Sequence, residues 1–360
     1  MVEKCIVCML KTDVHDHTLY KIKLGELRKL LNSLNVEVAE MVVQSRIKPT
    51  SSYLLGRGKA QELANIKDKV QPDFVVFYNT LSSKQRYNLE KLLKIPIYDR
   101  FDVTLKIFQK AATDSLSKTQ IELADLVKSF PYVKFQASMK YLRHRAGFKG
   151  GGEYAYHRKI TALHKRIKKL RVKIEKIKKR KLAFLEDLKE RGVKLACLSG
   201  YYNAGKTSLF NLLTGVNKPV SDMPFTTLSS KYSTLGKGKT YLVDTIGFVL
   251  DQDPRLISSF QINLMDIENS DTVLILMDIS DPPFVLKIKI NEILDIIQNR
   301  LKIEGSRLVI VLNKLDKIGP RRAIEVISKV RESVGRIPVY AISVKNRTGI
   351  SNILQFLSKS

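Results

Sequence analysis

The sequence contains few cysteines, few acidic residues beside its basic ones, and no long apolar run. Three cysteines in 360 residues do not make a disulfide framework, which excludes a disulfide-stabilised secreted domain. No stretch is apolar over the roughly 20 residues that a membrane-spanning helix needs. The N-terminus has no signal-peptide pattern. We therefore predict a cytoplasmic protein without stable membrane insertion; we also expect a monomer.

Two of the cysteines, Cys5 and Cys8, have the C-x-x-C spacing of some metal and redox sites. They lie within an apolar run typical of a buried strand, and a strand directs side chains three positions apart to opposite faces. No second cysteine pair completes a zinc site. A buried strand is therefore favoured over a metal or redox role.

The shortage of acidic residues is pronounced, because 63 Lys and Arg oppose 35 Asp and Glu and give a formal net charge of +28. Such an excess predicts an anionic partner, either nucleic acid or an anionic membrane. The alternative is that the whole proteome is basic, and clustering of the charge in this chain argues against it. The length of 360 residues allows two or three domains.

The clearest motif is G-x-x-x-x-G-K-T at residues 200–207, a phosphate-binding loop. An apolar segment typical of a buried strand precedes it, and a segment that begins like a helix follows. In that setting, backbone N–H groups and the helix N-terminus point at the phosphates. Lys206 is expected to reach the β- and γ-phosphates, and Thr207 to offer its hydroxyl to Mg²⁺. The nucleotide-binding residues predicted here are Asn203, Ala204, Gly205, Lys206, Thr207 and Ser208.

Two further segments supply groups that a triphosphate and Mg²⁺ need. Asp244 ends a predicted strand and can hold Mg²⁺ through water, while the N–H of Gly247 can sense the γ-phosphate. Before this strand, Thr227, favoured over Thr226, is placed to bring a hydroxyl onto Mg²⁺. The predicted metal ligands are thus Thr207, Thr227 and Asp244, and the predicted catalytic residues are Lys206, Thr227 and Gly247.

The sequence N-K-x-D at residues 313–316 follows another predicted strand and indicates which base the bound nucleotide carries. The carboxylate of Asp316 can accept hydrogen bonds from guanine N1–H and the 2-amino group, whereas adenine offers no such donors. Asn313 would orient the loop and Lys314 would flank the base. The residues expected to close over the base are Ser343, Val344 and Lys345. Together, these loops predict a GTPase that converts GTP to GDP and phosphate.

Phe248 occupies the position at which Ras-like proteins carry a glutamine that orients the attacking water. A phenyl ring cannot do this, so we predict slow intrinsic hydrolysis that a partner or a cation accelerates. Asn203 is a candidate K⁺ ligand, because several G proteins that lack the glutamine have asparagine at this point and use K⁺. The alternative is that Asn203 only shapes the turn.

The apolar pattern predicts three domains. Residues 1–100 alternate short apolar runs with helical patterns, which indicates an α/β domain with a mostly parallel sheet. Residues 101–192 predict a long antiparallel helical hairpin, with Pro131 closing the first helix and Lys181 interrupting the apolar seam of the second. Residues 193–360 predict a doubly wound α/β domain that contains the phosphate loop.

The positive charge is concentrated on the second predicted helix. From Arg158 to Lys181 there are thirteen Lys or Arg and one acid, Glu175. Such a face is solvated, lies on a membrane, or docks on RNA phosphates. RNA is favoured, because exposed faces normally mix signs and the apolar seam already has a partner helix. The RNA-binding residues predicted on this helix and the glycine-rich loop before it are Arg143, Arg145, Lys149, Arg158, Lys165, Arg166 and Lys169.

With these motifs, the chain resembles the HflX family of translational GTPases. Beyond the nucleotide loops, the resemblance rests on residues 53–60, 81–90, 99–108 and 119–124. It implies binding to the large ribosomal subunit, with the N-terminal and helical parts facing ribosomal RNA. Bacterial members split stalled or stressed ribosomes, and many carry G-x-G-E-T-Q-L-E where this chain reads G-G-G-E-Y-A-Y-H at residues 150–157.

Two alternatives come from other classes of protein. One is a GTP-gated binding protein of membranes or regulatory proteins, with no ribosomal role. The other is an RNA-remodelling ATPase in which the glycine turn at residues 56–59 forms a second nucleotide site. That turn lacks a complete fingerprint, so a purely structural turn is favoured.

Overall fold

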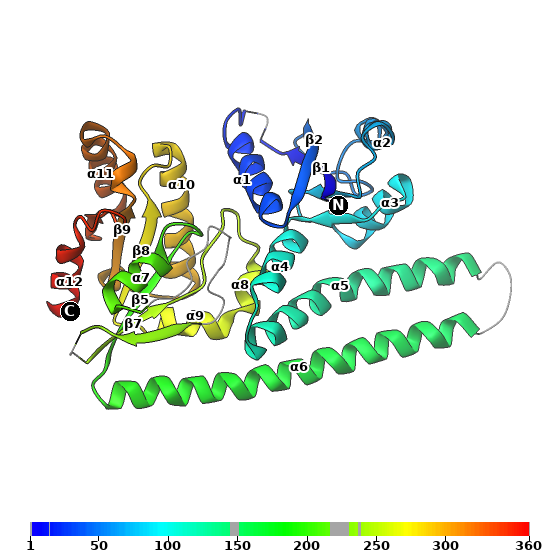
Figure 1. Cartoon of the computed structure of the whole chain (residues 1–360). Helices are drawn as coiled ribbons and strands as arrows, with labels where there is room; N and C mark the ends of the chain where they lie inside the picture. Colours follow the sequence, from blue (N-terminus) through cyan, green and yellow to red (C-terminus); the bar gives the residue numbers. More distant parts are fainter. Residues whose placement is uncertain (1, 14, 145–150, 217–229, 237–238, 360) are drawn as a thin grey trace. The chain divides into compact units, whose positions relative to one another are not determined.

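A computed structural model describes residues 2–13, 15–144, 151–216, 230–236 and 239–359 of the chain (Figure 1). The chain divides into two compact units. The first comprises Met1–Lys110 and Lys118–Ile174, and the second comprises Ala111–Ser117 and Glu175–Ser360. The predicted α/β class is confirmed, whereas the domain boundaries at residues 100 and 192 stay a prediction.

The sheet of the first unit has four parallel strands joined by helices. In chain order its elements are β1 (Glu3–Lys11), α1 (Leu19–Ser33), β2 (Val36–Ser45), α2 (Arg57–Val70), β3 (Phe74–Phe77), α3 (Ser83–Leu93) and β4 (Ile97–Asp99). The strand order is β2-β1-β3-β4, and each neighbouring pair is parallel. Right-handed crossovers through this order place α1 on one side of the sheet and α2 and α3 on the other (Figure 1).

The first strand carries both N-terminal cysteines in the interior. Cys5 and Cys8 are fully buried, and burial raises the pKa of the Cys5 thiol to about 12 and that of Cys8 still further. Burial therefore disfavours the thiolate form of both side chains, which is the reactive and metal-binding form. Within the described residues, no group of three or more His, Cys, Asp or Glu is arranged to hold a metal ion. The interpretation as a buried strand is confirmed.

The glycine turn before α2 has an evident structural role. The N–H of Gly56 donates to Gln44 Oε1 at 2.8 Å, and α2 begins at the next residue. A Cβ atom on Gly56 would lie 3.2 Å from Gln44 Nε2, so glycine leaves room for the Gln44 amide. These contacts account for the turn without a second nucleotide.

The helical region consists of α4 (Arg100–Ala111), α5 (Ser115–His144) and α6 (Gly151–Glu190). The helical pattern over residues 101–130 is thus shared by two helices, and the side chain of Asp114 accepts the Ser117 N–H at 2.9 Å where α5 starts. The predicted antiparallel pairing of α5 and α6 is confirmed. Phe130 stacks on His164 with 5.7 Å between ring centroids, and Glu122 pairs with Arg166.

Pro131 lies inside α5, so the prediction that it ends the helix is wrong. A proline in a helix interior removes one backbone hydrogen bond. The side chains that follow it are held within the first unit, since Tyr132 hydrogen-bonds to Glu90 and Phe135 packs edge-on against Tyr87. This packing outweighs the lost bond, and the helix continues to His144.

The apolar seam of α6 is buried on both sides of its interruption. Ile167 and Leu170 in the first unit are buried, and so are Leu185 and Leu188 in the second. Lys181 falls between these pairs, and its ammonium lies 2.7 Å from the Asp266 carboxylate. No helix in the described part of the chain, α6 included, is long and apolar enough to cross a bilayer.

The second unit contains a six-stranded sheet in the order β10-β9-β8-β5-β7-β6. Its strands are β5 (Lys194–Gly200), β6 (Lys231–Thr234), β7 (Thr240–Asp244), β8 (Thr272–Asp278), β9 (Leu308–Asn313) and β10 (Val339–Ala341). Its helices are α7 (Lys206–Thr214), α8 (Pro254–Ser259), α9 (Gln261–Glu268), α10 (Pro283–Leu294), α11 (Pro320–Val334) and α12 (Ile350–Lys359). The pairs are parallel except β6 with β7, which is antiparallel.

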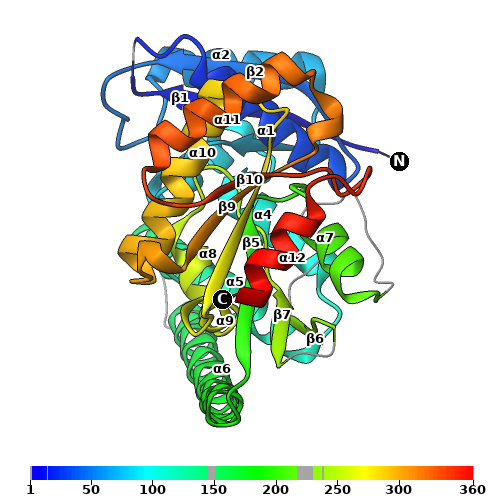
Figure 2. The same cartoon turned by 90° about the vertical axis from the view of Figure 1, so that its left-hand side faces the viewer.

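Helices cover both faces of this sheet, as the doubly wound prediction requires. Leu209 and Phe210 of α7 share one apolar core with Ile353 and Leu357 of α12, while α10 and α11 lie on the opposite side (Figure 2). Because parallel strands end at the same edge, the loops at residues 200–207, 244–248 and 313–316 converge there. Sequence analysis missed β6, a short edge strand whose side chains are half-buried or exposed.

Replacing Pro131 with alanine should stabilise the protein. Pro131 is exposed, so no cavity forms, and alanine restores a backbone donor in the helix interior. We expect the free energy of unfolding in urea to rise by about 1 to 3 kcal/mol. Pro320→Ala is the matched control, because Pro320 is the first residue of α11, where proline is favourable. A lower unfolding midpoint for Pro131→Ala would contradict this account.

Candidate functional site

The phosphate loop joins β5 to α7 through two glycines that no other residue can replace. Gly200 has a φ of +129°, and a Cβ atom there would lie 2.1 Å from the Leu276 carbonyl oxygen. Gly205 has a φ of +95°, and its Cβ atom would lie 2.3 Å from Asn313 Nδ2. The first glycine lets the loop pass close to β8, and the second lets it receive the Asn313 side chain.

Lys206 is buried at the first turn of α7, with 7% of its surface exposed. Its ammonium donates to the carbonyl oxygens of Gly200 and Tyr201 at 3.1 and 2.8 Å, so it lies inside the loop. Burial lowers the pKa of Lys206 to about 8, although the Asp244 carboxylate acts in the opposite direction. An anion bound in the loop would stabilise the charged form.

Thr207 and Asp244 form a pair of oxygen donors beside the loop. The Thr207 hydroxyl donates to Asp244 Oδ2 at 3.1 Å, and Asp244 is fully buried at the end of β7. The next residue is fixed as well, because the Thr245 hydroxyl donates to the Leu198 carbonyl at 2.7 Å. A hydroxyl beside a carboxylate suits Mg²⁺, which prefers hard oxygen ligands. The third predicted ligand, Thr227, lies outside the described residues.

The segment after Asp244 is bound to the phosphate loop through its backbone. Phe248 N donates to the Gly200 carbonyl at 3.0 Å, and Tyr202 N donates to the Phe248 carbonyl at 2.9 Å. A Cβ atom on Gly247 would lie 2.8 Å from Lys206 Nζ, so glycine allows the ammonium to sit against this segment. Phe248 is only 2% exposed, so its ring is not presented to solvent.

Asn313 joins the loop after β9 to the two loops beside it. Its Nδ2 donates to the Ala204 carbonyl at 2.8 Å, and its Oδ1 accepts the Val344 N–H at 3.1 Å. One buried side chain thus connects the phosphate loop with the segment predicted to close over the base. This geometry is what an orienting role for Asn313 requires.

Asp316 is held by the loop that follows β10. The Ser343 hydroxyl donates to Asp316 Oδ1 and in turn accepts the Asn346 N–H at 3.1 Å. The hydrogen bond from Ser343 lowers the pKa of Asp316, so the carboxylate is ionised and ready to accept hydrogen bonds. Lys314 adopts a left-handed conformation with φ of +69° and pairs with Asp278 at 2.7 Å. Lys345 is exposed beside them.

Three protein-family models match the chain, described as GTP-binding GTPase N-terminal (residues 21–109), GTP-binding GTPase Middle Region (111–183) and 50S ribosome-binding GTPase (196–314). A curated protein from Thermofilum pendens named GTPase HflX is 34% identical over 92% of this chain and 78% of its own length. One of the same name from Thermococcus kodakarensis is 33% identical over 87% and 71%. The chain belongs to the HflX family of GTPases. It therefore binds guanine nucleotide and hydrolyses GTP.

A solved structure shares the fold of this HflX-family chain. The crystal structure of SsGBP in complex with GDP matches 99% of this chain and 98% of its own, with a TM-score of 0.53 and 22% sequence identity. At that identity the match shows the arrangement of the fold alone.

The predicted RNA-binding residues of this HflX chain fall into two groups. On α6, Arg158, Lys165 and Lys169 are exposed, and exposed Arg166 makes a bidentate ion pair with Glu122 at 2.6 and 2.8 Å. Arg143 is in the last turn of α5, and its side chain is not among those described. The positions that lie outside the described residues are Arg145 and Lys149.

Sequence analysis missed the polar contacts behind the phosphate loop. The buried Tyr201 donates its hydroxyl to Glu292 Oε2 at 2.9 Å, and Glu292 Oε1 accepts the Gln252 N–H at 3.3 Å. Glu292 on α10 thus links the phosphate loop to the segment after Phe248. No local signal marks this contact, because Tyr201 and Glu292 are 91 positions apart.

Asn203 has a φ of +56° at an exposed turn of the phosphate loop. Asparagine tolerates this conformation better than most residues, so shaping the turn accounts for its presence. A role in K⁺ binding remains a separate prediction.

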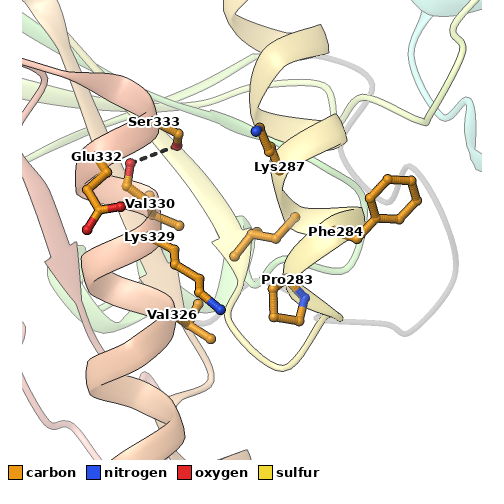
Figure 3. Close-up of a pocket in the computed structure, with 9 residues that line it drawn as sticks. Pro283, Phe284, Lys287, Val326, Lys329, Val330, Glu332 and Ser333 are labelled. Carbon is orange, nitrogen blue, oxygen red and sulfur yellow. Dashed lines mark hydrogen bonds between the residues drawn. The ribbon is translucent and has the colours of Figure 1, made fainter.

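A groove elsewhere on the second unit lies apart from the nucleotide loops. Pro283 and Lys287 of α10 lie on one side of it, and Val326 and Lys329 of α11 lie on the other (Figure 3). None of the predicted nucleotide-binding residues lines it, so it has no part in the GTP site.

Asp316→Asn should change the preferred base from guanine to xanthine. The asparagine amide matches the xanthine carbonyl but leaves guanine N1–H and the 2-amino group without their charged acceptor. We expect GTP affinity to fall about 100-fold or more in nucleotide titrations, with a gain for xanthosine triphosphate. Glu325→Gln, which removes one exposed acid from α11, is the charge-matched control. Unchanged GTP selectivity would refute the assignment of Asp316.

Proposed function

We propose that this chain is a Mg²⁺-dependent GTPase that binds the large ribosomal subunit in its GTP state and leaves it after hydrolysis. The observation that carries this proposal is the basic surface of α6. Of the thirteen Lys and Arg from Arg158 to Lys181, eleven are exposed, with a single acid among them. The description of the family model over residues 196–314, a 50S ribosome-binding GTPase, supports the same partner.

The basic surface of α6 suits ribosomal RNA better than a membrane. A helix that lies on a membrane presents an apolar stripe to the lipid. Among the described side chains of α6, the seam residues Ile167 and Leu170 are buried, and the exposed large apolar side chains, Val172, Leu182 and Phe184, are far fewer than the eleven exposed Lys and Arg. Lys and Arg gain affinity for phosphates through counterion release, which needs no apolar contact. We assign RNA contacts in the described part of α6 to Arg158, Lys165, Arg166 and Lys169.

We assign Mg²⁺ to Thr207 and Asp244, together with Thr227. The ion would neutralise charge on the β- and γ-phosphates. Lys206 would contact the same phosphates in place of its loop carbonyls, and the Gly247 N–H would sense the γ-phosphate. Because the Phe248 ring is buried and cannot orient water, we propose slow intrinsic hydrolysis. The bound subunit, or K⁺ beside Asn203, would supply the acceleration.

Reversing charge on the basic surface should weaken subunit binding. For the triple variant Arg158→Glu, Lys165→Glu, Lys169→Glu, we expect the slope of log affinity against log salt to fall by about 2 to 3. Cosedimentation with purified large subunits over a salt series measures it. The control is Arg321→Glu, Arg322→Glu, Arg336→Glu, the same charge change on exposed residues of the second unit.

An unchanged slope in the α6 variant would identify the helix as a solvated face. Flotation of the wild-type protein with anionic liposomes, without cosedimentation, would favour the alternative of membrane or regulatory-protein partners.

Purified large subunits should stimulate GTP hydrolysis. We expect a rate increase of at least about tenfold, because the position of Phe248 supplies no side chain to orient water. Rates measured in K⁺ and in Na⁺ separate stimulation by the subunit from stimulation by a cation. No increase in either salt would argue against a ribosome-gated GTPase.

A further inference from the structure

Three elements of the second unit meet in a buried polar cluster formed by Lys181 of α6, Tyr232 of β6 and Asp266 of α9. The Lys181 ammonium lies 2.7 Å from Asp266 Oδ1. The Tyr232 hydroxyl accepts a hydrogen bond from Lys181 and donates one to the same carboxylate oxygen. Each side chain therefore contacts the other two.

The surroundings of the cluster restrict its geometry. The Asp266 side chain is 1% exposed and that of Lys181 17% exposed, so both charges are largely withdrawn from water. The ammonium also lies 4.5 Å from the Tyr232 ring centroid, and Phe184 packs edge-on against that ring. A buried carboxylate needs its cation, so Asp266 and Tyr232 stay in place only while Lys181 does.

The cluster connects α6 to the elements that flank the segment after β7, which is expected to contact the γ-phosphate. Tyr232 comes five residues after Thr227, and its strand pairs with β7, where Lys231 lies opposite Asp244. Asp266 lies in α9, which follows the segment that contains Gly247 and Phe248. On α6, the residues just before Lys181 include the exposed basic residues Lys179 and Arg180. Lys181 itself faces Asp266 and is no part of the RNA-binding set assigned above.

We propose that Lys181 is a positioning residue for GTP hydrolysis, through which RNA bound on α6 acts on the segment that contains Gly247 and Phe248. This inference rests on the proposed binding to the large subunit. RNA that holds α6 stabilises the arrangement in which Lys181 contacts both Tyr232 and Asp266. That arrangement holds β6 and α9 together and so fixes the position of the segment between β7 and α9, which contains Gly247 and Phe248. A ligand shifts such an equilibrium only through contacts of its own that differ between the two states, and the exposed Lys179 and Arg180, next to Lys181, are the residues through which RNA would do so.

A purely structural ion pair predicts a different result. Its loss would lower the melting temperature and change hydrolysis by the same factor with and without the subunit. A coupling role predicts loss of stimulation, while the basal rate, the KM for GTP and subunit affinity change little. The ratio of stimulated to basal rate therefore separates the two roles.

The test uses the full chain and purified large subunits. Lys181→Met keeps the aliphatic stem, and Tyr232→Phe keeps the ring against Phe184 but removes the hydroxyl. We expect each to lower the stimulated rate at least about fivefold, with less than about a twofold change in basal rate and in cosedimentation. Lys181→Arg should restore part of the stimulation, because it returns the positive charge. Lys189→Met, an exposed charge-matched change in the last turn of α6, should behave as wild type.

Each outcome is informative. Equal stimulation of wild type, Lys181→Met and Tyr232→Phe overturns the positioning role. If the wild-type protein binds the subunit but its GTP hydrolysis is not stimulated, the positioning role is overturned and the binding proposal stands. If the wild-type protein does not bind the subunit, both proposals are overturned. If the melting temperature of Lys181→Met is well below that of the wild type, the double variant Lys181→Met, Asp266→Asn replaces it, because it buries no unpaired charge. The double variant and Tyr232→Phe then distinguish the positioning role from a purely structural one.

Discussion

The nucleotide site depends on how closely the backbone after β5 passes its neighbours. A side chain at Gly200 would collide with the Leu276 carbonyl, so only glycine lets the loop lie this near β8. The same approach allows Phe248 to bond to the loop backbone, and Asn313 holds the loop from the side of β9. The residues that make these contacts lie at the ends of separate strands. They come together because a parallel sheet brings the carboxyl ends of its strands to one edge.

Buried charges lie where elements must keep a defined position. Lys206 lies inside the phosphate loop. In the same unit, Lys181 of α6 pairs with the buried Asp266 of α9. In the first unit, Lys128 of α5 pairs with the buried Asp99 at the end of β4, and burial raises the pKa of that carboxyl. Each charge is stable only beside its partner, so displacement of one element changes the energy of the next. Such contacts suit a protein that changes state with its nucleotide.

α6 combines two requirements in one helix. Ile167, Leu170, Leu185 and Leu188 of its apolar seam are buried and supply packing energy, while most of its basic side chains are exposed. The seam is interrupted at Lys181, where a polar contact replaces an apolar one. Apolar and basic residues can thus lie on different faces of the same helix, because side chains three or four positions apart share a face.

The sequence by itself determined the α/β class, the phosphate loop and the basic helix. Each of these depends on residues close together in the chain, such as the spacing from Gly200 to Thr207. Only the tertiary structure decided that α5 continues through Pro131, that β6 pairs at the sheet edge, and that Tyr201 reaches Glu292. Those features depend on partners distant in the sequence, whose packing outweighs the local preference of the residues involved.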